Sequence, residues 1–175
     1  MDITKFKQYL GYGVRPNLFE VELTFPSISG ISSDLQEKFT FLCKAASQPQ
    51  SNIGKIEVPY QGRVLPIPGD RGAFEDYTVT VLNDAKYDLR NAFETWHNAM
   101  NQMEENTPKE DYDNLTVEMK FHQLDRKKNK IKTYTFVSAW PVNVGNIESS
   151  SETNDSIEEF QVTFAYLLWK SDTTS

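Results

Sequence analysis

Residues 115–137 read LTVEMKFHQLDRKKNKIKTYTFV, and apolar and polar side chains alternate along most of this stretch. The apolar positions of its first half are Leu115, Val117, Met119 and Phe121. A polar turn over 125–129 separates them from a second alternating run, 131–137. A period of two is typical of strands that bury one face, so the pattern predicts two strands joined as a β-hairpin.

The same alternation recurs through the chain, at residues 18–25, 38–45, 77–82 and 160–169. Strands with one apolar and one polar face are typical of antiparallel sheets, so we expect a mainly β protein with antiparallel pairing. The last segment, 160–169, places Leu167 and Trp169 on its otherwise polar face. This pattern indicates burial on both sides, as a subunit interface requires.

One segment has the period of a helix instead. Within 84–103, apolar residues recur at intervals of three and four: Leu89, Phe93, Trp96, Met100 and Met103. This spacing predicts an amphipathic helix, with Asp84 as its N-cap and Asp88 in its first turn.

Residues 46–72 contain four prolines and four glycines. Proline cannot donate to a sheet ladder, so the apolar runs 56–60 and 64–67 within this segment belong to edge strands or to an extended structure. We therefore expect an arm over 46–72 that contacts something other than the central sheet.

Composition excludes several classes of function. The chain has 175 residues, 18 Lys and Arg, 25 Asp and Glu, and a formal net charge of −7. These values suit a single domain over 1–175 and argue against a general nucleic-acid binder. We find no stretch of 18 apolar residues and no hydrophobic signal at the N-terminus, so we expect no membrane association and synthesis in the cytoplasm.

Candidate chemistry is sparse. Cys43, the single cysteine, excludes a disulfide framework and multi-cysteine metal sites, and we expect it to be a buried, inert thiol. His97 and His122 are expected on solvent-facing or interface positions rather than as metal ligands. We find no nucleophile with a base and an acid. The sequence therefore predicts a non-enzyme with no cofactor and no metal.

A cluster of cations surrounds the turn of the hairpin: Arg126, Lys127, Lys128, Lys130 and Lys132. One interpretation is a solvated turn that protects an edge from aggregation. The other is a docking patch for an acidic partner or a neighbouring subunit. The sequence leaves the role of this cluster open.

Several motifs follow one another in a distinctive order: Arg15-Pro16-Asn17-Leu18-Phe19, then 39–45, then Gly69-Asp70-Arg71, then 77–84, then Trp140-Pro141 with 142–145, and finally 160–164. In this order they resemble the tail tube proteins, the major tube subunits, of contractile-tailed bacteriophages. The resemblance covers about 15–169. Longer loops at 27–36 and 104–114 depart from the family pattern.

The resemblance implies two packed antiparallel sheets, like a β-sandwich or barrel, with one flanking helix and the extended arm. It implies a structural virion protein whose hexameric rings stack into the inner tube of a contractile tail. The implied partners are further copies of the chain, the tail sheath protein, the tape-measure protein, and the baseplate and tail-terminator proteins. Double-stranded DNA would pass through the tube transiently and without specificity.

Site residues follow from the same resemblance. We expect interface or loop-organising roles for Arg15, Pro16, Asn17, Gly69, Asp70, Arg71, Trp140 and Pro141. The alternative hypothesis is that these eight residues only shape turns within one subunit. Glu20 and Glu22, on the polar face of the first strand, are candidates for a net negative channel lining.

Two alternatives remain at this point. The chain could be a relative of the same fold that starts or ends the tube, although no extra domain is evident. It could instead be a monomeric β-barrel that carries a small apolar ligand, which would require an enclosed apolar cavity.

Overall fold

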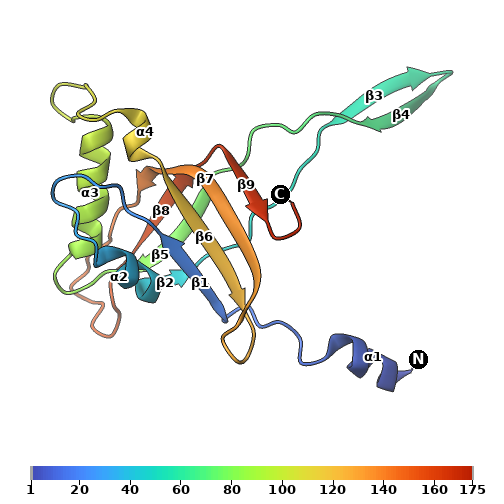
Figure 1. Ribbon diagram of the computed structural model, residues 1–175, viewed down its shortest axis with the longest axis horizontal. Helices are drawn as coiled ribbons and strands as arrows, with labels where there is room; N and C mark the ends of the chain where they lie inside the picture. The colour runs from blue at the N-terminus through green and yellow to red at the C-terminus, as the bar shows by residue number, and fades with distance from the viewer. Residues whose placement is uncertain (1, 175) are drawn as a thin grey trace.

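The structure is a computed structural model and describes residues 2–174 of the chain. Its strands form two antiparallel layers that are joined through one long, bent strand, β7 (Lys130–Val144) (Figure 1). The prediction of a mainly β, antiparallel fold is therefore confirmed. We call the layers the first sheet and the second sheet.

The first sheet has the strand order β1–β6–β7–β9. Its members beside β7 are β1 (Phe19–Leu23), β6 (Val117–Leu124) and β9 (Leu168–Ser171). β6 and the first half of β7 form the hairpin that the sequence predicted, with Phe121 opposite Tyr134. Val21 and Leu23 on β1 are buried, whereas the intervening Glu22 faces away from the core. The alternation of β1 is thus confirmed.

The second sheet begins with the other half of β7 and continues in the order β8–β5–β2. These strands are β8 (Glu159–Ala165), β5 (Tyr77–Leu82) and β2 (Cys43–Ala45). β7 changes sheets where Ser138 has a positive φ of 53° and the pairing register shifts on both sides. The resulting bend lets one strand serve two layers.

Helix α3 (Asp88–Met100) packs its apolar face onto the core between the sheets. Phe93 and Trp96 on this face are fully buried and lie against Phe164 of β8. The observed helix is shorter at both ends than the helix predicted over 84–103. Tyr87, in a left-handed conformation with φ 59°, occupies the N-cap position expected for Asp84.

The prediction of a strand over 38–45 was wrong for most of that segment. Residues Leu35–Leu42 form helix α2, and only the last three residues form β2. Leu35 and Phe39, four residues apart, point into the core, whereas Phe41 is 78% exposed. Burial of one helical face between α3 and β1 outweighs the strand-like alternation of Phe39, Phe41 and Cys43.

The single strand expected over 160–169 is two strands. β8 ends at Ala165, and β9 begins at Leu168 and pairs with β7 in the first sheet. Leu167 at the crossing is exposed, and its N–H donates to Val137 O. The apolar residues on the second face therefore mark a change of sheet rather than a strand buried on both sides.

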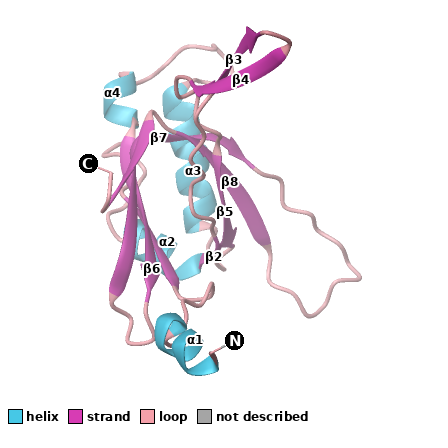
Figure 2. Cartoon of the chain, turned by 90° about the vertical axis from the view of Figure 1, so that its right-hand side faces the viewer, coloured by secondary structure: helices cyan, strands magenta, loops and turns pink. Residues whose placement is uncertain are grey.

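Three smaller elements lie at the periphery. Figure 1 shows the hairpin of β3 (Lys55–Tyr60) and β4 (Arg63–Pro68) extending from the upper part of the molecule, while α1 (Ile3–Leu10) hangs below it. Figure 2 confirms that the hairpin and α1 lie at opposite ends. The short helix α4 (Tyr112–Leu115) precedes β6 at the upper end. The described chain thus has four helices rather than one flanking helix.

Candidate functional site

The first sheet has one face in the core and one polar outer face. By strand alternation and register, this outer face carries Glu20 and Glu22, Glu118, Lys120 and His122, Lys130, and Lys170. Three glutamates and three lysines make these strand positions formally neutral. The two predicted candidates, Glu20 and Glu22, are therefore side by side with cations, and the face has no excess of acids.

Glu22 lies at the centre of a small charged cluster on this face. Its Oε1 is 2.6 Å from Lys130 Nζ and 3.3 Å from His122 Nε2. The hydrogen bond from Lys130 holds the pKa of Glu22 below its usual value. The cluster ties β1, β6 and β7 together on their outer side.

His122 is only 4% exposed, although its strand position is on the polar face. Its Nδ1 is 2.9 Å from Thr133 Oγ1, while its Nε2 lacks a partner with hydrogen-bond geometry despite the nearby Glu22. Burial, with a smaller contribution from Lys130, lowers the pKa of His122. Of the two expected positions, the solvent-facing one is wrong, because neighbouring side chains cover the ring, and an interface position stays a prediction.

Trp140 and Pro141 lie in the second half of β7, within the main body of the molecule. Pro141 is buried, and its carbonyl oxygen is 2.9 Å from His97 Nε2 on α3. Trp140 packs against the core and faces Tyr112 of α4 at 6.5 Å between ring centroids. In one chain these two residues hold the helices against the bend of β7.

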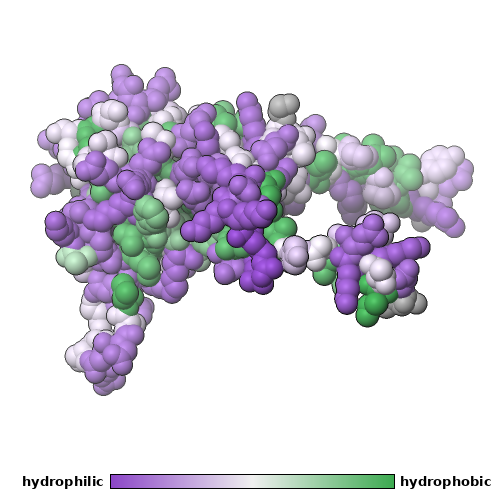
Figure 3. All heavy atoms as spheres, turned by 60° about the horizontal axis from the view of Figure 1, so that its bottom comes forward, coloured by the Kyte–Doolittle hydropathy of each residue, from purple (hydrophilic) through white to green (hydrophobic). Residues whose placement is uncertain are grey.

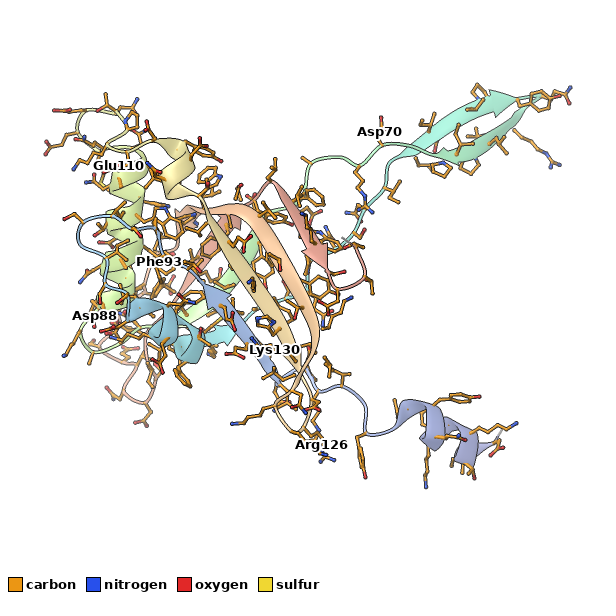
Figure 4. The ribbon with its side chains drawn as sticks, in the orientation of Figure 1. Asp70, Asp88, Phe93, Glu110, Arg126 and Lys130 are labelled. Atoms are coloured by element: carbon orange, nitrogen blue, oxygen red, sulfur yellow. The ribbon has the colours of Figure 1, made fainter. Side chains whose placement is uncertain are left out.

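Gly69, Asp70 and Arg71 close the base of the β3–β4 hairpin. Gly54 N–H donates to Asp70 O at 2.8 Å, and Gly69 N–H donates to Gly54 O at 2.7 Å. Arg71 donates from Nη1 to Ser51 Oγ at 3.0 Å. Figure 4 shows Asp70 where the two segments that lead into the β3–β4 hairpin converge.

The hairpin presents an apolar face with no partner among the described residues. Ile56 lies opposite Ile67, and Val58 lies opposite Leu65, so these side chains share one face together with Tyr60. Each of the five is between 39% and 67% exposed. A two-stranded hairpin in water has marginal stability. The hairpin thus leaves a contiguous apolar face exposed.

Arg15, Pro16 and Asn17 are exposed and lie in the connection between α1 and β1. Gln123 Nε2 donates to the carbonyl oxygens of Arg15 and Leu18, at 2.9 and 2.6 Å, and so anchors this connection to the end of β6. The predicted interface residues thus occupy three separate places: this connection, the base of the arm, and the bend of β7.

Sequence reasoning missed α1, which has no buried residue. Ile3, Phe6 and Leu10 form an exposed apolar stripe along it. The signals were present, because Asp2 accepts from the N–H groups of Thr4 and Lys5, and Gly11 follows with φ 55°. Figure 3 shows hydrophobic side chains on both α1 and the hairpin, away from the main body.

Three of the five clustered cations around the hairpin turn remain exposed without an ion-pair partner in the described range: Arg126, Lys127 and Lys128, which we call the basic turn. Lys130 pairs with Glu22, and Lys132 bonds to Thr173. Arg126 lies over the Tyr12 ring at 5.3 Å and so links the turn to the N-terminal connection.

Within residues 2–174, no group of three or more His, Cys, Asp or Glu side chains is arranged to hold a metal ion. Cys43 is half-buried rather than fully buried, and burial raises the pKa of its thiol to about 12. No helix in the same part of the chain combines the length and the apolar character needed to cross a membrane.

Comparison with known proteins identifies the family of this chain. The profile of the family described as "Phage tail tube protein" matches residues 14–172. The chain belongs to the phage tail tube protein family. The tail tube protein gp19 of Enterobacteria phage T4 is 32% identical over 160 residues, which cover 89% of this chain and 90% of that protein. The tail tube protein of Serratia phage KSP90 is 32% identical over 163 residues, which cover 93% and 91%.

Solved structures share the fold. The tube-terminating cap of the anti-feeding prophage has a TM-score of 0.64 at 18% identity and covers 93% of this chain and 92% of that one. The sheath–tube complex of an extracellular contractile injection system has a TM-score of 0.60 at 12% identity and covers 98% of both chains. A phage tail tube protein is a structural component of the virion, so the chain is not an enzyme, as the sequence predicted.

Proposed function

We propose that this chain is the main subunit of the inner tube of a contractile tail, in which six copies form a ring and rings stack. The observation that carries the proposal is the four-stranded first sheet, apolar inside and polar outside, in a member of the tail tube family. A polar outer face suits the wall of a water-filled channel.

The strand directions are consistent with closure of this sheet into a ring. β1 and β9 are its two outermost strands, and each neighbouring pair in the sheet is antiparallel. β1 and β9 therefore run in opposite directions. When β9 of one subunit lies beside β1 of the next, the alternation continues around the whole ring, and closure removes the outer edges.

The dimensions also suit the proposal. Six subunits with four strands each give about 24 strands, and with about 4.8 Å between strands and about 40° tilt the backbone diameter is about 48 Å. Side chains would leave a bore of about 38 Å, which accommodates duplex DNA. In this arrangement Glu20 and Glu22 face the channel. We now expect a wall with balanced charge, because three lysines accompany the three glutamates.

A balanced polar wall suits the passage of DNA. Without an excess of cations, few counterions would be released on contact, so phosphates are not retained. During assembly the same channel would hold the tape-measure protein. The second sheet and α3 face the opposite way from the channel and would contact the tail sheath, while the two ends of the tube would meet baseplate and terminator proteins.

The arm over 46–72 is proposed to contact another subunit. The apolar face of its hairpin has no partner in the described chain, and its base is closed by the Gly54–Asp70 and Gly69–Gly54 hydrogen bonds. Arg71 contributes to that base, whereas Arg15, Pro16 and Asn17 would contact a neighbour at the opposite end. For Trp140 and Pro141 we propose an indirect role, since they shape β7.

The interior argues against a small-ligand carrier. Phe39, Phe93, Phe136 and Phe164 are fully buried between the sheets, so aromatic side chains fill the space that a ligand would need. The relatives named as tail tube proteins, matched over nearly their whole length, favour the repeated subunit over a tube-end relative.

Negative-stain electron microscopy of the purified, concentrated chain tests the proposal. We expect sixfold rings or hollow tubes with a bore of about 38 Å. A variant that lacks residues 55–68 should remain a folded monomer and fail to stack. A chain that stays monomeric both alone and with assembled baseplates would contradict the proposed function, and tubes formed by the deletion variant would contradict the role of the arm.

A further inference from the structure

The two ends of the first sheet carry opposite charge. The basic turn follows β6, whereas an acidic segment over 104–113, which we call the acidic loop, precedes β6 and runs into the first turn of α4. The acidic loop contains five acids and one lysine, and the acids are Glu104, Glu105, Glu110, Asp111 and Asp113. Figure 4 places Glu110 at the upper end of the molecule and Arg126 at the lower end.

The backbone of the basic turn is held by Asp125. The carboxylate of Asp125 accepts from the N–H groups of Lys127 and Asn129, at 2.7 and 2.9 Å, and from Asn129 Nδ2 at 2.9 Å. These hydrogen bonds lower the pKa of Asp125, so the carboxylate remains ionised. The turn therefore displays its cations on a defined scaffold.

The acidic loop is held in a similar way. Gln102 N–H donates to Thr107 O, and Asn106 N–H donates back to Gln102 O, each at 2.9 Å. Lys109 N–H donates to Ala99 O at 3.1 Å and fastens the loop to the end of α3. Asn101 Nδ2 adds a bond of 2.7 Å to Asn106 Oδ1. Glu104 and Glu105 lie at the tip of this closed turn.

The charges at both ends are available for an external partner. All three cations of the basic turn and all five acids of the acidic loop are exposed, and none has an ion-pair partner among the residues that the structure describes. The cations and anions of the intervening outer face, by contrast, balance one another. The basic turn and the acidic loop thus carry unpaired charge of opposite sign.

We propose that the basic turn of one subunit docks against the acidic loop of a subunit in the adjacent ring. This inference rests on the proposed function, because it requires copies stacked in one direction. Stacking along the strands brings the lower end of one copy to the upper end of the next (Figures 1 and 2). Complementary patches set the orientation and register of association, and like charges brought together oppose the reverse order.

The pairing accounts for the direction of stacking as well as its strength. A ring placed upside down would bring two acidic ends or two basic ends together. Single exposed ion pairs contribute little, but the contact is repeated by each subunit around a ring. Screening at higher salt should weaken it, because the charges are exposed to solvent.

Charge reversal on the full-length chain tests the pairing. One variant carries Lys127→Glu and Lys128→Glu, a second carries Glu104→Lys and Glu105→Lys, and a third combines all four changes. The matched control carries Glu148→Lys and Glu152→Lys, two exposed acids on a different loop. Tube mass is measured by sedimentation at about 0.1 M salt and tube length by electron microscopy, with circular dichroism to verify folding.

Each two-residue reversal should reduce the sedimented fraction about tenfold, while the combined variant and the control should match the wild type. Tubes of normal length from either two-residue variant would overturn the pairing. A combined variant that folds but does not regain the wild-type sedimented fraction would overturn it as well. If only the basic-turn reversal matters, the turn binds another partner, such as DNA at the tube end, and the pairing is wrong. A wild-type chain that forms no tubes would instead overturn the proposed function.

Discussion

Among single residues, Asp84 connects two helices of the fold. Its carboxylate accepts from the N–H groups of Asp88 and Leu89 in the first turn of α3, and Lys38 Nζ of α2 lies 2.7 Å from it. Asp84 thus supplies acceptors for the first turn of α3 although Tyr87 occupies the N-cap position. Only its exact place relative to the helix differs from the sequence-based expectation.

The first prediction concerns this carboxylate. Asp84→Ala should lower the free energy of unfolding by about 1–2 kcal/mol, because two N–H groups of α3 lose their acceptor. The matched control is Asp34→Ala, since Asp34 occupies the N-cap of α2 without a capping hydrogen bond from its side chain. Urea denaturation of the unassembled chain measures both. Equal losses for the two variants would contradict the assigned role of Asp84.

The second prediction is a pH dependence that arises from His122. Its pKa is below the ordinary value of 6.5 in the folded chain, so the unfolded chain binds the proton first as the pH falls. Stability should therefore decrease as the pH drops below about 6.5. Glu22, whose pKa is lowered by Lys130, adds a further loss of stability at more acidic pH.

His122→Gln should reduce the loss of stability just below pH 6.5, measured by urea denaturation between pH 8 and pH 5. An unchanged pH profile in this variant would show that His122 is not the group responsible.

Among the elements, those with one clear period were predictable and those with two competing periods were not. The β6–β7 hairpin and α3 each have a single unambiguous apolar spacing. In α2, Leu35 and Phe39 fit a helix while Phe39, Phe41 and Cys43 fit a strand, and only tertiary packing decides between them. The division between β8 and β9 depends on pairing with distant strands, which alternation does not encode.

The candidate site was also only partly predictable from the sequence. Proline content predicted an arm over 46–72, and the structure places Gly69, Asp70 and Arg71 at the base of the β3–β4 hairpin, whereas their interface role stays a prediction. The cover over His122 and the balanced charge of the outer face come from side chains on three strands that are far apart in the sequence. Only the register of the sheet brings them together.

The third prediction concerns the base of the arm. A Cβ on Gly54 would lie 2.8 Å from Asp70 O, a backbone atom that cannot move aside at low cost. Gly54→Ala should therefore open the base at a cost of about 1–3 kcal/mol and speed tryptic cleavage at Lys55 and Arg63 several-fold. The melting temperature of the core should not change. Gly72→Ala is the matched control, because its Cβ would meet no atom within 4 Å. Equal cleavage rates for the two variants would contradict the assigned closure.

At the scale of the whole molecule, the first sheet has two outermost strands that a ring would place side by side. β1 carries Glu20 and Glu22 on the outer face, and β9 carries Lys170 on the same face. Around a closed ring, Glu20 of one subunit and Lys170 of the next would therefore line the same seam with opposite charges. Opposite charges across neighbouring strands stabilise their pairing.

The fourth prediction follows from this seam. A chain with Glu20→Cys and Lys170→Cys, treated with a thiol-specific cross-linker, should give a ladder of covalent oligomers that ends at six subunits, because both thiols line the seam and paired strands lie only about 4.8 Å apart. Native Cys43 should react slowly, since burial raises the pKa of its thiol to about 12. The control combines Glu20→Cys with Glu152→Cys, whose second thiol lies on a loop outside the first sheet. Denaturing gels of assembled tubes provide the measurement. A ladder from the control alone, or no oligomers from the seam pair in intact tubes, would place the subunit boundary elsewhere than between β1 and β9.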